Sequence, residues 1–176
     1  MNFSHGEKLI LVMLAEIYKS AKIKGEIDPD LVLKAVFNNQ AWALGWKYRS
    51  VFHSEEKNSA VVEETCQILD MYRTITSSFD KLPQAEKVLV EQGAGHFSDY
   101  LNFQGFDHNN DEHSWVVPTL VNDLQKYQEI KNPDLNSHSI ATIGHYRRML
   151  AKFKAMPLDQ QSYKLTADQL IEILKP

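Results

Sequence analysis

Cysteine is nearly absent from the chain, since Cys66 is the only one in 176 residues. A single thiol cannot form an internal disulfide, so we expect a protein of a reducing compartment, the cytoplasm. Glycine and proline are also sparse, with seven and six residues. These are too few for an all-β chain built on frequent tight turns, and no stretch shows the period-two alternation of a half-buried strand.

The chain also lacks an excess of positive charge and a long apolar run. Its formal net charge is −4, whereas binding to a phosphate backbone rests on a concentrated positive surface, so nucleic acid is not expected as the main partner. The unbroken apolar run at residues 9–15 is far shorter than the roughly 20 residues of a membrane-spanning helix. We therefore expect no contact with a membrane.

Helical periodicity is what the sequence does have. Ser4 followed by Glu7 is the pattern of a capping box, which starts a helix, and Gly93 is expected to end another helix in the left-handed conformation. Helices are expected over residues 4–22, from 29 onwards, 59–79, 83–92, 96–102, 111–127 with a kink or break at Pro118, 139–156, and 166 onwards. The sequence predicts an all-α fold, a single compact domain over residues 1–176 with about seven to nine helices.

The first helix, over residues 4–22, has apolar side chains in every direction around its axis. This pattern is typical of a central helix that packs on several sides, and we expect the other helices to surround it. The alternative is a helix that lends one side to a second copy of the chain, which would make the protein a homodimer.

The stretch from 103 to 113 holds the densest set of groups suited to chemistry, and it reads FQGFDHNNDEH. From Asp107 onwards it begins like a calcium loop, but Glu112 stands at the sixth place, where such a loop needs glycine, and Pro118 at the twelfth, where it needs a bidentate glutamate, so an EF-hand is excluded. His108, Asp111 and His113 are candidate ligands for zinc or iron. They lack the spacing that places two histidines on one helix face, so no metal is expected.

The architectural interpretation of this stretch is more specific. Gly105 provides a turn next to Phe106, and Asp107 or Asn110 caps the following helix by accepting from its free N–H groups. Asp111 places negative charge at the positive end of that helix. We interpret these residues as a structural loop.

A basic side is expected on the helix over residues 139–156. Imidazole, guanidinium and ammonium groups there form a candidate surface for an anion or a partner: His145, Arg147, Arg148 and Lys152. The ordinary explanation of such a pattern is a solvated helix face.

Three segments of the sequence are distinctive: residues 63–73 (EETCQILDMYR), residues 103–107 (FQGFD) with Asn110 soon after, and residues 146–150 (YRRML) followed by residues 165–170 (LTADQL). Together they resemble the bacterial YfbU family. The resemblance implies an all-helical, cytoplasmic bacterial protein whose activity is not established, and it supplies no catalytic residues. The family often has glycine where this chain has His108, so His108 is expected to adopt a positive φ if that glycine is left-handed.

These observations favour a non-enzymatic interaction or regulatory protein without a cofactor, acting as a homodimer or with another protein partner. The alternative is a small-molecule- or metal-dependent enzyme that uses the loop over residues 103–113. A third interpretation is a weak nucleic-acid binder that uses the basic side of the helix over residues 139–156.

Overall fold

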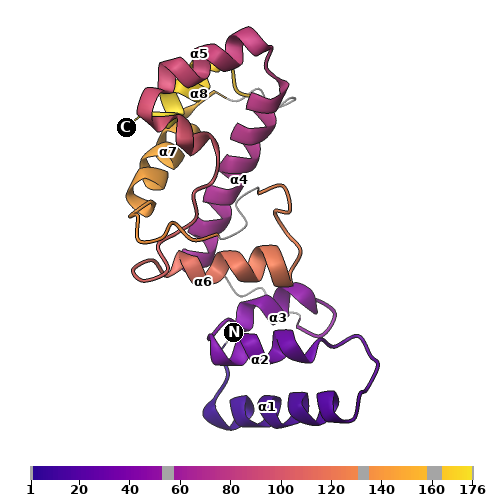
Figure 1. Cartoon of the computed structure of the whole chain (residues 1–176). Helices are drawn as coiled ribbons and strands as arrows, with labels where there is room; N and C mark the ends of the chain where they lie inside the picture. Colours follow the sequence, from indigo (N-terminus) through magenta and orange to yellow (C-terminus); the bar gives the residue numbers. More distant parts are fainter. Residues whose placement is uncertain (1, 53–57, 131–134, 158–163, 176) are drawn as a thin grey trace. The chain divides into compact units, whose positions relative to one another are not determined.

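Every regular element that the structure describes is helical (Figure 1). The structure is a computed structural model, and it describes residues 2–52, 58–130, 135–157 and 164–175. These ranges contain eight α-helices and two short helical segments, so the all-α prediction is confirmed. The described residues divide into two compact units, one made of residues 1–59 with 119–126 and the other of residues 60–118 with 127–176. The single domain stays a prediction.

The first unit contains α1 (His5–Ser20), α2 (Pro29–Phe37), α3 (Ala41–Lys47) and the π-helical segment η2 (Thr119–Asp123). Its helix starts follow from local sequence signals. The Glu7 N–H donates to the Ser4 hydroxyl over 3.3 Å and the Ser4 N–H donates to the Glu7 carboxylate over 2.8 Å, which completes the capping box. Asp28 caps α2, and Pro29 occupies its first position, where a missing N–H costs nothing.

The core of this unit is small. Its buried apolar residues come from α1, α2 and α3: Ala15, Leu31, Val32, Ala35, Ala43 and Leu44. Only one of the six, Ala15, belongs to α1. The expectation that α1 is a central helix surrounded by the others is therefore wrong, because a single face of α1 packs against its own unit.

The second unit contains α4 (Ala60–Lys81), α5 (Gln84–Ala94), the 3-10 segment η1 (Gly95–Leu101), α6 (His113–Pro118), α7 (Ile143–Ala155) and α8 (Ala167–Leu174). Helix α4 packs against α6, α7, η1 and α8. The centre of this unit is aromatic: the rings of Tyr72, Phe103, Phe106 and Tyr146 have centroids 5.3 to 5.5 Å apart in their contacting pairs. Such edge-to-face and stacked pairs fix the positions of the segments that carry them.

The carboxyl ends of α5 and α6 can be compared with the ends expected from the sequence. Helix α5 runs on through Gly93 to Ala94, and the residue with positive φ is Gly95, at 57°. Gly93 instead lies against α8, where an added Cβ would come within 2.6 Å of the Ile171 Cδ1 atom, so its small size serves helix packing. Pro118 is the last residue of α6, which agrees with the break expected there, because proline has no N–H group to donate within a helix.

Candidate functional site

The loop over residues 103–113 is held in place by the backbone of residues 135–137 in the second unit. The Phe106 N–H donates to the Leu135 carbonyl over 3.2 Å, and the Ser137 N–H donates to the Phe106 carbonyl over 3.0 Å. Gly105 has a φ of 80°, and a Cβ added there would lie 2.5 Å from the Asn136 nitrogen. A left-handed φ and a close backbone approach both require glycine at this position.

The carbonyl of Gly105 also accepts two side-chain hydrogen bonds. The Thr142 hydroxyl donates to it over 2.8 Å and the Tyr146 hydroxyl over 2.9 Å. The Tyr146 oxygen in turn accepts from the Gln104 N–H over 3.0 Å. Burial raises the pKa of Tyr146, so its hydroxyl keeps the proton that it donates.

Asp107 organises the turn that follows. Its carboxylate accepts from the Asn109 N–H over 3.0 Å and from the Asn110 side-chain amide over 2.5 Å, and these two hydrogen bonds hold the pKa of Asp107 below its usual range. Asp111 accepts from the Asp107 N–H over 3.2 Å. These carboxylates satisfy the turn itself, whereas the expectation was that Asp107 or Asn110 would cap the next helix; α6 begins only at His113.

The candidate metal ligands point to different neighbours. The ring of His108 packs against Trp115 with centroids 4.1 Å apart, whereas His113 is buried and contacts Glu64. Within the described ranges, no group of three or more His, Cys, Asp or Glu side chains could hold a metal ion. His108 is also not among the described residues with a positive φ, so the expected left-handed conformation at this position is wrong.

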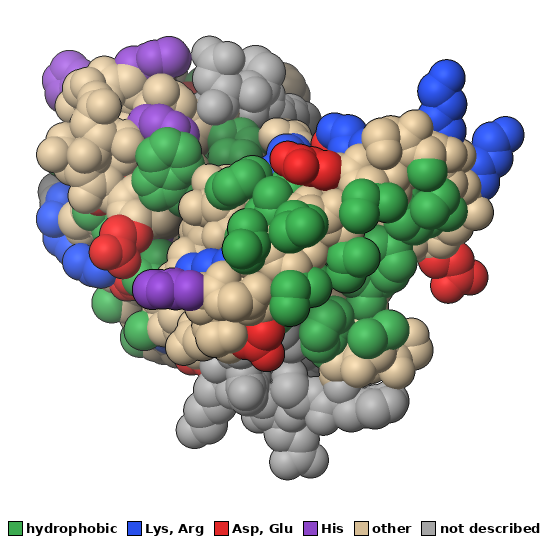
Figure 2. All heavy atoms as spheres, turned by 90° about the horizontal axis from the view of Figure 1, so that it is seen from below, with side chains coloured by type: hydrophobic (Ala, Val, Ile, Leu, Met, Phe, Trp, Pro, Cys, Tyr) green, Lys and Arg blue, Asp and Glu red, His purple; other side chains and the backbone are tan. Residues whose placement is uncertain are grey.

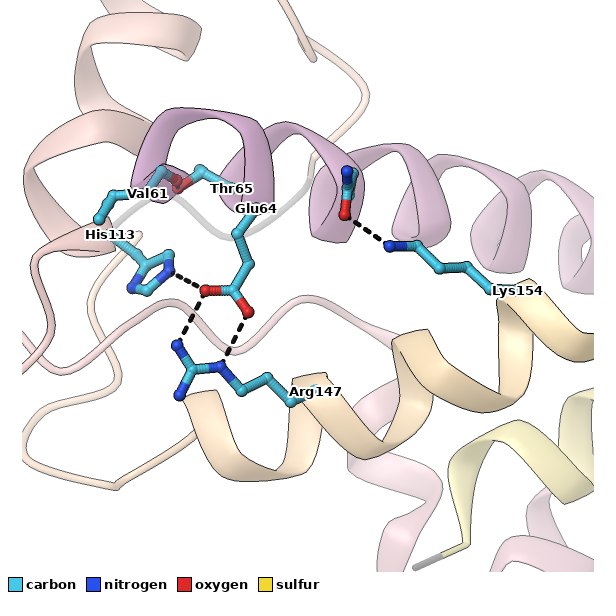
Figure 3. A network of polar contacts seen from close by, with 7 residues as sticks. Val61, Glu64, Thr65, His113, Arg147 and Lys154 are labelled. Carbon is cyan, nitrogen blue, oxygen red and sulfur yellow. Dashed lines mark hydrogen bonds and ion pairs between the residues drawn. The ribbon is translucent and has the colours of Figure 1, made fainter. Parts of the chain in front are cut away.

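A polar network joins α4, α6 and α7 (Figure 3). The guanidinium of Arg147 donates to both oxygens of the Glu64 carboxylate, over 2.8 and 2.9 Å, and Nε2 of His113 lies 2.8 Å from the same carboxylate. These partners, Arg147 foremost, lower the pKa of Glu64 to about 2 against the cost of burial. The carboxylate is therefore ionised at neutral pH and holds three helices together.

His113 is itself fixed on its second side by stacking on Phe106, with ring centroids 5.1 Å apart. Its Nδ1 is buried and has no hydrogen-bond partner among the described residues. Nε2 is directed at Glu64, whereas Nδ1 lies within the core of the second unit. The His113 side chain, which is 7% exposed, therefore contacts both Glu64 of α4 and Phe106 of the preceding loop.

An open groove of about 490 Å³ runs beside the network between α4 and α7. Its polar lining comes from Glu63, Glu64, Gln67, Arg147 and Lys154. Across the groove, the ammonium of Lys154 donates to the Gln67 side chain over 2.7 Å (Figure 3).

The expected basic side of α7 is not a single surface. His145 is buried at 5% exposure, stacked on Phe97 and in contact with Tyr100. Burial, with the nearby Arg148 cation, lowers the pKa of His145, and Arg148 donates to its Nδ1 over 3.4 Å. The placement of His145 on a solvated face was therefore wrong.

The other two cations of that candidate surface contact their own unit. Arg147 is bound to Glu64, as described above. Lys152 donates to the backbone carbonyls of Glu172 and Lys175 over 3.0 Å each, at the carboxyl end of α8, where a cation complements the helix dipole.

The first unit carries a surface of a different kind. Five large apolar side chains on α1 are between 53% and 62% exposed: Leu9, Ile10, Met13, Leu14 and Ile17. Figure 2 shows hydrophobic side chains gathered over this side of the molecule. We call these five residues the α1 outer face; the opposite side of α1, with Leu11 and Ala15, packs on the unit's own core.

A family model of the YfbU domain matches residues 1–176, the whole chain. The chain belongs to the YfbU family. Comparison with curated proteins and with solved structures gave no match. No helix within the described ranges combines the length and apolar character needed to cross a bilayer.

The segments that carry the YfbU resemblance meet in the second unit of the YfbU domain. Glu64 comes from residues 63–73, Gly105 from residues 103–107, and Arg147 and Tyr146 from residues 146–150. The role of Glu64 was missed at the level of sequence, because its partners lie 49 and 83 residues away. The only signal was that Glu64 and Arg147 both lie within these matching segments.

Proposed function

We propose that this YfbU domain is a non-enzymatic interaction protein and that the α1 outer face is its contact surface. The observation that carries the proposal is the exposure of Leu9, Ile10, Met13, Leu14 and Ile17, each more than half accessible. Scattered exposed leucines are ordinary on a protein surface, but a contiguous apolar patch on one helix is typical of an interface.

The face is also held in a fixed geometry, which favours recognition. Helix α1 is capped at Ser4, and its inner side is tied to the rest of the unit by two polar contacts. Lys8 donates to the Asn39 side chain over 3.3 Å, and Lys19 pairs with Asp30 over 2.6 Å. A helix that is already formed loses less conformational entropy when a partner binds than a segment that must fold on binding.

The second unit supports the non-enzymatic part of the proposal. The carboxylates of Glu64 and Asp107 and the imidazoles of His113 and His145 are engaged by neighbouring side chains or rings of the protein itself. Groups used in this way stabilise the fold and are not poised to exchange protons with a substrate.

We further infer that the protein works in the cytoplasm. A lone cysteine, Cys66, suits a reducing compartment. Fractionation of the native source with an antibody against the chain tests this; recovery with secreted or membrane material would contradict it.

A matched pair of leucine variants tests the contact surface. Leu14 on the outer face and Leu89 on α5 are 57% and 56% exposed, so Leu14→Gln and Leu89→Gln remove the same side chain at equal accessibility. Light scattering over a concentration series should show that the wild-type chain and Leu89→Gln associate and that Leu14→Gln does not. If the wild type stays monomeric throughout, or if both variants associate like it, the outer face is not a self-association surface and the proposal fails.

A further inference from the structure

We propose that the partner of the α1 outer face is a second copy of this chain, bound with its α1 antiparallel across a two-fold axis between the two helices. The proposal rests on the interaction function argued above and names the occupant of the surface. It is drawn from the order of residues along the face.

The outward stripe of α1 reads almost the same in both directions. Met13 and Leu14 stand at the middle, Ile10 and Ile17 follow at equal distances on either side, and Gly6 and Ala21 end the stripe. All six are exposed. An antiparallel two-fold pairing of helices requires this kind of self-complementarity, because residues at mirrored positions of the two copies then lie at the same height along the helix pair.

The pairing gives each side chain a partner of suitable size. Ile10 of one copy packs against Ile17 of the other, at both ends of the contact. Met13 packs near its own counterpart at one edge of the interface, and Leu14 near its counterpart at the other edge. Apolar side chains of similar length then fill the space between the helices, as they do in antiparallel helix pairs.

Gly6 provides a second, independent observation. Gly6 lies in the first turn of α1, and no atom of the described residues comes within 4 Å of the position where its Cβ would stand. Packing within its own unit therefore does not require glycine at this position. In the antiparallel pair Gly6 faces Ala21 of the other copy, and two small residues allow the helix ends to approach closely.

The helix dipole favours the antiparallel direction over the parallel one. Antiparallel packing pairs opposed helix dipoles, whereas parallel packing places like ends of the two helices side by side.

The size of the face sets the expected strength. The stripe is one helix wide. Ile23 and Ile27, which follow α1, add two apolar side chains that are 50% and 40% exposed. A standard interface involves about 20–30 residues on each partner, whereas the α1 outer face has five large apolar side chains. The dimer is therefore expected to be reversible and to depend on protein concentration.

Cysteine cross-linking tests the register. In a Cys66→Ala background, which leaves no other thiol, Met13→Cys should form an intermolecular disulfide under mild oxidation. Ile10→Cys alone and Ile17→Cys alone should not, because each residue and its own counterpart lie about 10 Å apart along the axis, beyond the reach of a disulfide. An equimolar mixture of these two variants should form a mixed disulfide, and Leu89→Cys reports random collision.

The outcomes separate this proposal from the proposed function. Efficient cross-linking of Ile10→Cys with itself would show a parallel dimer, which overturns the antiparallel register but keeps the outer face as the interface. No cross-link above the Leu89→Cys level at any of the three positions, in a chain that nevertheless associates, would overturn the second-copy occupant of this face. A chain that does not associate at all removes both proposals.

Discussion

Arg147 donates two hydrogen bonds, of 2.8 and 2.9 Å, to the Glu64 carboxylate across the contact between α7 and α4. His113, the first residue of α6, joins the same carboxylate over 2.8 Å. One acidic side chain thus holds three helices of the second unit, and the loop that precedes α6 is fixed at its far end by this contact. In the second unit these charged side chains contact one another, whereas α1 of the first unit presents exposed apolar side chains.

The stability of the protein should depend on pH through Glu64. Its pKa in the folded state is about 2, against an ordinary value of 4.5, so between these values the unfolded state binds more protons than the folded state. The contribution of Glu64 is therefore fully present above pH 4.5 and is lost as the pH falls towards 2. Urea unfolding across this range should show a shallower pH dependence for Glu64→Gln than for the wild type.

Glu64→Gln should also lower the free energy of unfolding at pH 7, by about 1–2 kcal/mol, because Arg147 and the buried His113 lose a charged acceptor. Glu63→Gln is the matched control, since Glu63 is its exposed neighbour on α4; this variant should follow the wild-type profile. A Glu64→Gln protein with the wild-type pH profile would show that the network adds nothing to stability.

Gly105 should not tolerate a side chain. Its φ of 80° strains any L side chain, and an added Cβ would stand only 2.5 Å from the Asn136 nitrogen, so Gly105→Ala should lower the free energy of unfolding by at least about 2 kcal/mol. Chemical denaturation measures the change.

Gly144→Ala provides the contrast within the same unit. Gly144 lies in α7, and the nearest atom to an added Cβ is Arg148 Nη1 at 3.8 Å. Alanine there should raise the stability by about 0.4–1 kcal/mol through the entropy of the unfolded chain. Equal effects of the two substitutions would contradict the role given to the loop.

Features set by neighbouring residues were predictable from the sequence. The capping boxes at Ser4 with Glu7 and at Thr166 with Gln169 are both present, and Pro118 ends α6. Each depends on groups within one helical turn, so the residue types alone decide the hydrogen bonds.

Contacts between distant segments were not predictable in the same way. Periodicity shows that α1 is apolar all round, but not which side its own unit covers, so the helix was placed at the centre. His145 was assigned to a basic surface because its helix neighbours are basic, whereas Phe97 and Tyr100, more than forty residues earlier in the chain, cover it. Glu64 was overlooked for the same reason, since nothing local marks its pairing with Arg147.

The most direct test of the central claim is a mixing experiment with two charged variants of the outer face, Ile10→Glu and Ile17→Lys. Each alone should be monomeric by light scattering at a concentration at which the wild type associates, because a charge would be buried against isoleucine. Mixed in equal amounts they should associate again, since one end of the antiparallel pair then joins opposite charges and the other keeps Ile10 against Ile17. A mixture that stays monomeric, or single variants that associate like the wild type, would contradict the account.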